Sequence, residues 1–445
     1  MKTQEHNKKR VCVIGAGAAG MMCAVFAAKS GADVTLFEKN TSQKHFSSEE
    51  YFDNAYMGKK LLITGKGRCN VTNNCDEDTF LKNVPVNPKF LYAALHGFST
   101  ADTMDFFESG GCELKTERGN RVFPKSDKAL DILRVLKDRI RQYGVKVINR
   151  AVAEIGTADG EFKSVTDSSG NLYEFDAACI CTGGISYPVT GSTGDGYRFA
   201  ENTGHNIKTP KASLVPLTSD DALCADCQGL SLKNVTVSVV DNKKKKKVYS
   251  ALGEMLFTHY GLSGPLILSA SAHMRDIEKD RYKICIDLKP SLDEKTLDNR
   301  LRSDFSKYIN KDMKNALCDL LPSKLILPFL SYCGIKPGEK PNGITKEQRH
   351  AMVRALKDLE ISISGTRPVA EAIITSGGVS VKDVNSSTME SKKIKNLYFA
   401  GEVLDVDAYT GGFNLQIAFS TGCLAGKNMG TRGDAKGYEG YALSF

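Results

Sequence analysis

The sequence lacks a long hydrophobic run, and that absence excludes one class of protein. No apolar stretch among the 445 residues approaches the ~20 residues that a membrane-spanning helix needs. Tryptophan is absent and aromatic residues make up only 8% of the chain, so no aromatic-rich binding surface is visible. We therefore expect a protein without a membrane span, and a cytoplasmic location is the default.

A disulfide framework is also missing, although the chain has 13 cysteines. Their number is odd, and most lie in apolar stretches such as Cys179 and Cys181, which is typical of buried thiols in a reducing compartment. Cys69 has no partner at CxxC spacing, which argues against a redox disulfide. Cys224 and Cys227 have that spacing, but no second pair or histidine cluster accompanies them, so we predict no metal site.

The excess of positive over negative side chains is modest, with a net charge of +8. Part of it is one run of five lysines at positions 243–247, which we interpret as the solvated tip of a hairpin. The other basic residues are dispersed. We therefore expect no nucleic-acid partner, and the oligomeric state is left open.

What the sequence does contain, at residues 11–38, is a nucleotide-binding pattern. A short apolar run meets Gly15, Gly17 and Gly20, an apolar helical stretch follows, and a second apolar run ends at the acidic residue Glu38. The glycines allow a tight turn, close approach of a pyrophosphate and close packing of helix on strand, while the acid accepts hydrogen bonds from a ribose. This stretch predicts dinucleotide binding without identifying the dinucleotide.

Two further junctions between strands and glycines point to flavin. A buried strand at 177–181 ends in Thr182, Gly183 and Gly184, and a later apolar strand ends in Ala400, Gly401 and Glu402. A carboxylate directly after a strand can hydrogen-bond the ribityl or phosphate portion of FAD. A helix that opens near Asn414 can direct its N-terminus at the flavin ring, where it stabilises negative charge by ~0.3–2 kcal/mol.

Four motifs make the resemblance specific: TGKGRCNVTN, SYPVTGSTGDGYRFAENTGH, LFTHYGLSGP and FAGEVLDVDAYTGGFNLQIAFSTG. Together they resemble the BaiN-like family of bacterial FAD-dependent oxidoreductases, which includes bile-acid dehydro-intermediate reductases and aminoacetone oxidases. The similarity spans nearly the whole chain. The TGDG and GGV…LYFAGE segments are also similar to fumarate-reductase-type flavoproteins.

The resemblance implies a set of FAD-binding residues in three groups. The ADP half would be held by Gly15, Gly17, Ala18, Ala19, Gly20, Glu38 and Lys39. The pyrophosphate and flavin would lie along Thr64, Gly67, Arg68, Cys69 and Asn70. The site would be completed by Thr182, Gly183, Asp195, Gly401, Glu402, Gly411, Gly412, Phe413, Asn414 and Leu415.

Catalytic residues are less sharply defined by the sequence. His259 lies in a Gly-rich turn between apolar segments, and its ordinary pKa suits proton transfer near neutrality, although a histidine that bonds loop backbone fits equally well. Tyr409 and Tyr187 are alternative proton donors. No second complete G-x-G-x-x-G unit is present, so NAD(P)H is expected to dock transiently as electron donor.

The order of patterns predicts an α/β fold with a discontinuous domain. A Rossmann-like FAD-binding domain is expected at 1–211 and 361–445, because strand–glycine patterns occur in both parts. An inserted β-barrel-like domain is expected at 212–290, where alternating stretches such as 235–239 and 282–288 indicate antiparallel strands. A helical subdomain is expected at 291–360. Within the first domain, residues 126–143 are expected to form a helix capped by Ser126.

The leading functional hypothesis is an FAD-dependent oxidoreductase that uses NAD(P)H to reduce a conjugated C=C of a hydrophobic small molecule, such as a steroid or bile-acid 3-oxo intermediate. An FAD-dependent amine oxidase of the aminoacetone type, producing peroxide, is an alternative. A second alternative is a flavin-bearing RNA- or protein-binding module that uses the lysines at 243–247.

Overall fold

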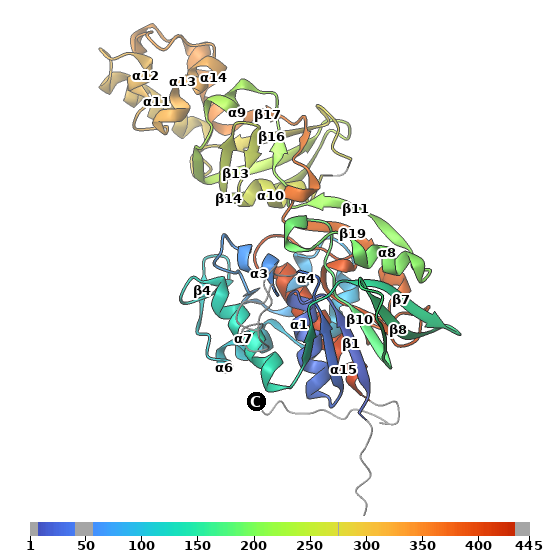
Figure 1. Cartoon of the computed structure of the whole chain (residues 1–445). Coiled ribbons are helices and arrows are strands. Elements are labelled where there is room, and N and C mark those ends of the chain that lie inside the picture. Colours follow the sequence, from blue (N-terminus) through green and yellow to red (C-terminus); the bar gives the residue numbers. More distant parts are fainter. Residues whose placement is uncertain (1–7, 41–56, 275, 432–445) are drawn as a thin grey trace, which may run out of the picture. The chain divides into compact units, whose positions relative to one another are not determined.

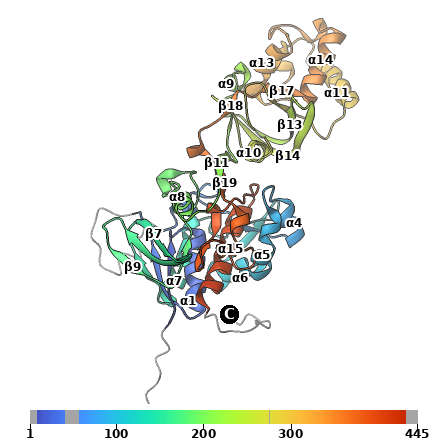
Figure 2. The same ribbon diagram turned by 90° about the vertical axis from the view of Figure 1, so that its right-hand side faces the viewer.

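The computed structural model describes residues 8–40, 57–274 and 276–431, and the chain divides into two compact units (Figures 1 and 2). Unit 1 combines Met1–Ala212 with Ile374–Phe445, and unit 2 is Ser213–Ile373. The chain returns to unit 1 at Ile374, whereas the sequence pattern placed this return at residue 361. The difference arises because strands β17 (Leu359–Ser362) and β18 (Gly365–Thr366) pair with strands of unit 2.

Unit 1 is built on a five-stranded parallel sheet in the order β20-β10-β1-β2-β6. Its strands are short apolar runs, as expected where both faces of a sheet are covered. Their bounds are β1 (Arg10–Ile14), β2 (Asp33–Phe37), β6 (Lys146–Ile148), β10 (Ala177–Ile180) and β20 (Leu397–Phe399).

Helices α1 (Ala18–Lys29) and α15 (Phe413–Gly430) come from opposite ends of the sequence and lie side by side, blue and red in Figure 1. Small residues allow this approach. A Cβ on Gly422 would come within 2.4 Å of the carbonyl oxygen of Ala19, and one on Gly426 within 2.4 Å of that of Cys23. The two ends of the sequence therefore form one packed layer against the same sheet.

Further elements of unit 1 surround this centre. They are α3 (Lys59–Ile63), β3 (Thr72–Asn73), α4 (Glu77–Lys82), α5 (Tyr92–Gly97), α6 (Thr100–Ser109), β4 (Leu114–Glu117), β5 (Arg121–Pro124), α7 (Ala129–Gln142), β7 (Val152–Ala158), β8 (Glu161–Asp167), β9 (Leu172–Glu174), α8 (Asp195–Asn202), β11 (Ile207–Ser213) and β19 (Ile374–Val379). Strands β3, β5 and β4 form one small sheet, and β7, β8 and β9 form another.

Helix α7 starts later than its sequence pattern predicted. The N-cap position is Lys128, without a side-chain hydrogen bond, and Ser126 instead donates its hydroxyl to Asp131 at 2.5 Å. The apolar stripe through Leu133, Leu136 and Ile140 is buried as the period requires, but Leu130 is 52% exposed. The helix was therefore predicted correctly and its cap was not.

Unit 2 contains a seven-stranded antiparallel sheet, a cluster of helices and a core of its own. The sheet has the order β17-β16-β13-β14-β15-β12-β18, with β12 (Leu217–Thr218), β13 (Ser231–Asp241), β14 (Lys246–Thr258), β15 (Gly261–Ser263) and β16 (Tyr282–Asp287). The helices are α9 (Ala222–Asp226), α10 (Pro265–Ser271), α11 (Glu294–Lys307), α12 (Met313–Ala316), α13 (Ser323–Tyr332) and α14 (Lys346–Lys357). Alternating apolar residues at 235–239 and 282–288 correctly predicted antiparallel strands, and the structure pairs these two strands, β13 and β16, with each other.

Two sequence expectations of a general kind can be compared with the structure. Within residues 8–40, 57–274 and 276–431, no helix has the length and apolar character that crossing a bilayer requires. All 13 cysteines fall in this part of the chain and all are free; most of them are buried. The expectation of buried, unpaired thiols is confirmed.

Candidate functional site

The predicted cofactor residues follow the carboxyl ends of neighbouring parallel strands in unit 1. Gly15 follows β1, Glu38 follows β2, Thr182 comes shortly after β10, and Gly401 comes shortly after β20. Since β20, β10, β1 and β2 are adjacent and parallel, these positions share one edge of the sheet. Open α/β sheets bind their ligands outside this edge. The fold therefore brings together residues that are far apart in the sequence.

The turn from β1 into α1 has the geometry of a phosphate-binding turn. A Cβ on Gly20 would lie 1.8 Å from the carbonyl oxygen of Gly15, so helix and turn are in backbone contact. A Cβ on Gly17 would meet nothing within 4 Å. Gly17 is the N-cap of α1, no side chain caps that end, and no acidic residue lies in its first turn. Among the described residues, no side chain therefore caps the N–H groups at the start of α1, and space beside Gly17 leaves room for an anion.

Glu38 is buried beside this turn, with 6% of its surface exposed. One carboxylate oxygen accepts the N–H of Ala16 at 3.0 Å, and the other accepts the N–H and the side-chain amide of Asn40 at 2.8 and 2.7 Å. Burial raises the pKa of Glu38, and these donors partly offset the shift. The carboxylate thus shapes the turn itself, and the oxygen that bonds Ala16 retains a further lone pair for a ribose hydroxyl.

Lys39 and Asp195, predicted from different motifs, form an ion pair at 2.6 Å. Lys39 also donates to the hydroxyl of Thr193, and Asp195 is the first residue of α8. Nearby, the hydroxyl of Thr182 is buried and has no hydrogen-bond partner among the described residues. An orphaned hydroxyl at the carboxyl edge of the sheet is consistent with a polar ligand at this place.

Glu402 is the centre of a hydrogen-bonded group that the sequence motifs only partly predicted. It pairs with Lys60 of α3 at 2.6 Å and accepts the hydroxyl of Ser186 at 2.9 Å and the N–H of Thr375 at 2.8 Å. Lys60 also donates to Ser186 at 2.6 Å. Lys60, Ser186 and Thr375 were not predicted. Lys60 lies four residues before Thr64 of the TGKG motif, which was the available signal.

The TGKGRCN loop is fastened to the start of α15. The amide oxygen of Asn70 accepts the N–H of Gly412 at 2.9 Å, while its amide nitrogen donates to the carbonyl oxygens of Thr72 and Val122. Asn73 donates to the carbonyl oxygen of Gly411 at 3.0 Å. Gly412 has a φ of +98°, and a Cβ there would lie 2.2 Å from the oxygen of Thr72. Two motifs separated by more than 300 residues therefore form one surface.

The N-terminus of α15 has no capping side chain and no acidic residue in its first turn. Asn414 instead fixes the preceding loop, because its side chain accepts the N–H of Ala408 at 2.9 Å and donates to the carbonyl oxygen of Ala408 at 2.7 Å. The positive end of the helix dipole is therefore not neutralised by a carboxylate of the same turn. That arrangement suits a ligand which carries or develops negative charge.

Of the three candidate proton donors, Tyr409 and Tyr187 belong to unit 1 and His259 belongs to unit 2. Tyr409 is next to the start of α15, where its carbonyl oxygen accepts the side-chain amide of Asn414 at 3.3 Å. His259 is exposed in the turn between β14 and β15 of unit 2, with its ring 4.9 Å from that of Tyr260. Tyr409 is therefore the candidate that shares a turn with the predicted FAD residues.

Arg68 and Cys69, both expected along the cofactor, have other partners in this structure. The Arg68 guanidinium donates to Glu117 and to Asp127, the latter at 2.6 Å, and lies 4.2 Å from the centre of the Phe123 ring. The Cys69 side chain is fully buried, and burial raises its pKa far above the ordinary value. The loop around them is thus held in place by its side chains, and its backbone is the part available to a ligand.

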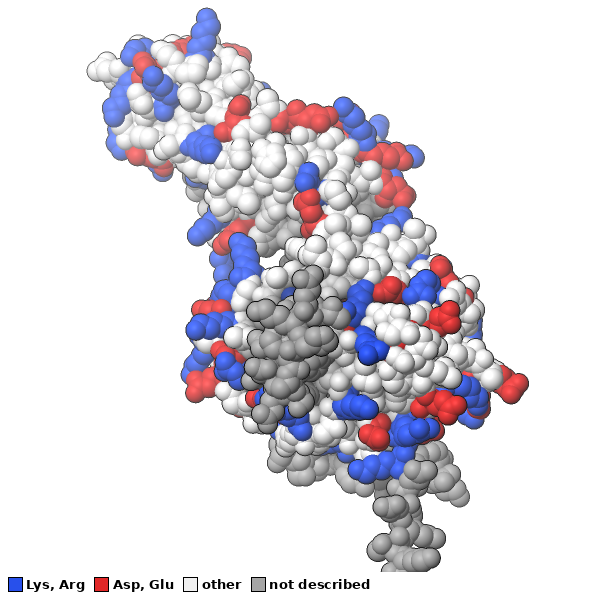
Figure 3. All heavy atoms as spheres, in the orientation of Figure 1, with Lys and Arg blue, Asp and Glu red and all other residues white. Residues whose placement is uncertain are grey.

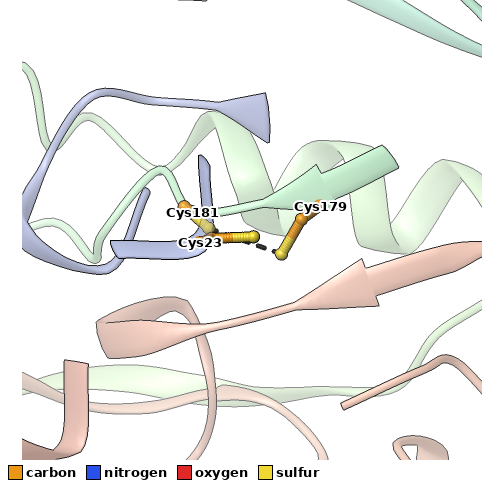
Figure 4. A group of neighbouring side chains, drawn as sticks. All are labelled: Cys23, Cys179 and Cys181. Atoms are coloured by element: carbon orange, nitrogen blue, oxygen red, sulfur yellow. Dashed lines mark hydrogen bonds between the residues drawn. The ribbon is translucent and has the colours of Figure 1, made fainter. Parts of the chain in front are cut away.

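Three buried thiols, those of Cys23, Cys179 and Cys181, lie close together (Figure 4). The sulfur atoms of Cys23, Cys179 and Cys181 all lie within 4.8 Å of one another, and those of Cys179 and Cys181 are 3.4 Å apart. None of the three residues is more than 4% exposed. Burial raises the pKa of Cys23 and Cys179, which favours the protonated thiols. The trio therefore packs α1 against β10 and was not foreseen from the sequence.

A second group, Cys285 with Asp358 and Glu360, spans β16 and β17 of unit 2. Both acids are exposed, and Glu360 already pairs with Lys283. Burial raises the pKa of Cys285 to about 12, so its thiolate is disfavoured at neutral pH. The two acids lie exposed at the β17 edge of the sheet, and Lys283 compensates part of their negative charge.

Comparison with known protein families shows to which family the chain belongs. The model of the family described as HI0933-like protein Rossmann domain matches residues 9–428. The chain belongs to this family. The match covers both parts of unit 1 and the whole of unit 2, so the predicted family resemblance and α/β fold class are confirmed.

Curated relatives of this HI0933-like protein span almost its whole length. A ribosomal RNA dihydrouridine synthase of Haemophilus influenzae is 32% identical and covers 92% of this chain and 95% of its own. A protein of the same description from Escherichia coli is 31% identical, over 94% and 97%. A 3-dehydro-bile acid delta(4,6)-reductase of Clostridium scindens is 29% identical, over 95% and 99%.

Solved structures show the same fold at low sequence identity. A 3-ketosteroid-delta4-(5alpha)-dehydrogenase of Rhodococcus jostii RHA1 aligns with a TM-score of 0.51 and 12% identity, covering 97% of this chain and 99% of that one. This alignment shows the fold alone. The family match and the full-length similarity to a protein named as a reductase confirm the predicted enzyme class, an oxidoreductase with a Rossmann-type FAD-binding domain.

Proposed function

We propose that the protein reduces a C=C bond conjugated to a carbonyl, using bound FAD and electrons from NAD(P)H. One observation carries this proposal. Three relatives that match nearly the full chain have names which describe this type of reduction on very different molecules. Dihydrouridine is uridine with its C5=C6 bond reduced beside a carbonyl, and a 3-dehydro bile acid with 4,6-unsaturation carries C=C bonds conjugated to a 3-oxo group.

The carboxyl edge of the unit 1 sheet supports the cofactor assignment. The residues that would hold the ADP half are the α1 N-terminus at Gly17, the buried Glu38 and the Lys39–Asp195 pair. The residues that would hold the flavin half are Glu402 and the α15 N-terminus. These groups offer free N–H donors to phosphate and acceptors to hydroxyls, which is the chemistry that FAD requires.

Bound FAD would supply a hydride to the substrate, and the protein's own residues would do the remaining work. The uncapped N-terminus of α15 would stabilise negative charge at the ring by ~0.3–2 kcal/mol. Glu402 is fixed by Lys60 and Thr375, so it would orient the cofactor without a change of its own position. Tyr409, beside the same turn, would donate the proton to the second carbon.

We infer that a uracil base in RNA is the first substrate to test. Two of the full-length relatives, at 32% and 31% identity, are named for that product. This proposal differs from the expectation of a hydrophobic small molecule and no nucleic-acid partner. A 3-oxo steroid or bile acid is the second candidate, and the 29% identical bile-acid reductase favours it.

The experiment uses FAD-loaded protein under anaerobic conditions with NADH or NADPH. RNA, free uridine and a 3-oxo-4,6-diene bile acid are offered in parallel, with cofactor oxidation followed at 340 nm and products analysed by mass spectrometry. We expect substrate-dependent oxidation and a product heavier by two hydrogens for at least one conjugated carbonyl compound. Peroxide formation from aminoacetone in air, with no reduction of any such compound, would instead support the amine-oxidase alternative.

A further inference from the structure

The most concentrated positive charge in the sequence lies at the tip of the β13–β14 hairpin. The five lysines at 243–247 occupy the turn and the first residues of β14, and all five are exposed. Elsewhere, positive and negative side chains are interspersed over the face shown in Figure 3. The hairpin tip therefore differs from the rest of the surface in carrying five like charges in succession.

None of these five lysines forms an ion pair with a residue in the described part of the chain. Carboxylates do pair with some other lysines of unit 2, as in Lys279–Asp220 at 2.9 Å, Lys307–Asp319 at 2.7 Å, Lys340–Asp312 at 2.8 Å and Lys357–Asp287 at 2.6 Å. The tip is thus a cluster of cations without internal compensation.

Hydrogen bonds to Asp241 and to the segment before β16 hold the turn that carries the lysines. The buried carboxylate of Asp241 accepts the N–H groups of Lys243 and Lys244 at 3.0 and 3.1 Å. Asn242 donates its N–H to the carbonyl oxygen of Arg281 and its side-chain amide to that of Asp280, both on the adjoining segment before β16. The tip is therefore an ordered turn whose lysine side chains are exposed to solvent. Repulsion between these neighbouring like charges destabilises the turn.

We propose that this lysine tip binds the phosphate backbone of an RNA substrate. The inference rests on the proposed function, because it supplies the docking surface for the RNA whose uracil would be reduced. Exposed, uncompensated lysines bind phosphates through release of condensed counterions, without reading sequence. The tip has no bulky apolar side chain among residues 242–247 that would insert into a lipid surface. A polyanion with closely spaced phosphates is therefore the partner that fits.

The test compares two variants with the same change in net charge. In the tip variant, Lys243, Lys244, Lys245, Lys246 and Lys247 are each replaced by Gln. In the control variant, five exposed and scattered lysines of the same unit are replaced by Gln: Lys233, Lys295, Lys311, Lys336 and Lys346. Binding of a fluorescein-labelled RNA hairpin with a uridine-rich loop is measured by anisotropy from 50 to 300 mM salt.

We expect the tip variant to bind the RNA hairpin about 10- to 100-fold more weakly at 150 mM salt, with the slope of log K against log[salt] reduced by about 3. The control variant should stay within about threefold of the unmodified protein. Equal loss in both variants would overturn the proposal, because net charge alone would then explain binding. Unchanged binding by the tip variant would overturn it as well.

Two further measurements separate this proposal from the proposed function. Vesicles with 30% phosphatidylserine serve as a second polyanion, and a tip-dependent association with them in the absence of RNA binding would overturn RNA as the partner. Reduction of free uridine or the bile-acid diene should proceed at the same rate in the tip variant and the unmodified protein. If no conjugated carbonyl compound is reduced by either protein while tip-dependent RNA binding persists, the proposed reaction fails and the docking surface stands.

Discussion

Gly17 and Gly20 are three residues apart on one turn, yet the structure gives them opposite tolerance for a side chain. A Cβ on Gly20 would meet the backbone oxygen of Gly15 at 1.8 Å, whereas one on Gly17 would meet nothing within 4 Å. Gly17 also has an ordinary φ of −80°. The two positions can therefore separate what the turn does for folding from what it does for a cofactor.

We expect Gly20→Ala to lower the free energy of unfolding by about 2 kcal/mol or more, because backbone must move to relieve the overlap. Gly17→Ala should change it by less than ~0.5 kcal/mol and should weaken FAD binding, because the methyl group occupies the approach to the helix N-terminus. Denaturant unfolding of FAD-free protein and titration with FAD measure the two effects. Equal destabilisation by both substitutions would contradict this separation.

The position of Tyr409 next to the α15 turn gives a prediction about proton transfer. We expect Tyr409→Phe to lower kcat for C=C reduction by about 10²- to 10⁴-fold, because a positioned acid is lost. The rate at which NAD(P)H bleaches the flavin should not change. His259→Gln, at the exposed turn of unit 2, is the matched comparison and should leave kcat within about threefold. A large loss with His259→Gln alone would reverse the assignment.

At the scale of elements, the small β7-β8-β9 sheet depends on one buried carboxylate. Asp167 accepts hydrogen bonds from the side chain and N–H of Asn171, from the N–H of Ser169 and from the hydroxyl of Tyr173, at 2.8–3.1 Å. The Asn171 side chain is the largest cause that lowers the pKa of Asp167. Because the folded pKa is depressed, this stabilisation is present above the unfolded pKa of ~3.9 and is lost as pH falls below it.

We expect Asp167→Asn to lower the unfolding midpoint in urea at pH 7 and to flatten the decline in stability below about pH 4. The free energy of unfolding of the unmodified protein should fall more steeply as the pH is lowered through that range. Urea unfolding at pH 7, 5, 4 and 3 measures both effects. Asp78→Asn, at an exposed carboxylate on α4, is the control and should leave the pH profile unchanged. Parallel profiles for Asp167→Asn and the unmodified protein would count against this role.

The contacts between the loop of residues 64–73 and α15 could not be predicted from the sequence pattern of either segment. Asn70 and Asn73 bond the backbone of Gly412 and Gly411, and the hydroxyl of Thr72 lies 2.6 Å from the amide oxygen of Gln416. No helical or strand period marks these residues. Their role follows from side-chain hydrogen bonds to backbone that lies more than 300 positions away in the sequence.

At the scale of the whole molecule, the two units have separate hydrophobic cores. The residues predicted to bind FAD all lie in unit 1. Ligand binding stabilises only the folded part that forms the site, by ~2.7 kcal/mol at a ligand concentration of 100 times Kd. Bound FAD should therefore stabilise unit 1 and leave the stability of unit 2 unchanged.

We expect calorimetry to show two unfolding transitions, of which FAD raises only the one belonging to unit 1, by roughly 5–10 °C at saturation. Proteolysis during the scan assigns each transition, because fragments of residues 213–373 identify unit 2. Gly17→Ala serves as the control, since weakened FAD binding should remove the shift. A single transition that moves as a whole would show that the two units unfold together.

The sequence by itself determined the parts whose geometry is local. The turn at Gly15–Gly20, the acid after β2 and the glycine and acid after β20 were predictable, because each depends on a few adjacent residues and on the rule that ligands bind at strand ends. The lysine tip was also predictable, because a charge run between two alternating stretches indicates a solvated turn.

Only the tertiary structure decided which of these parts meet. Lys60 pairs with Glu402 across 342 positions, and Arg68 pairs with Glu117 and Asp127. One cysteine of α1, one of β10 and Cys181 just after β10 form one buried group. The return to unit 1 at Ile374 likewise depends on pairing of β17 and β18 with strands far away in the sequence. Such contacts leave no local period or spacing, because the free energy that selects them comes from burial and hydrogen bonds formed only when the whole chain has folded.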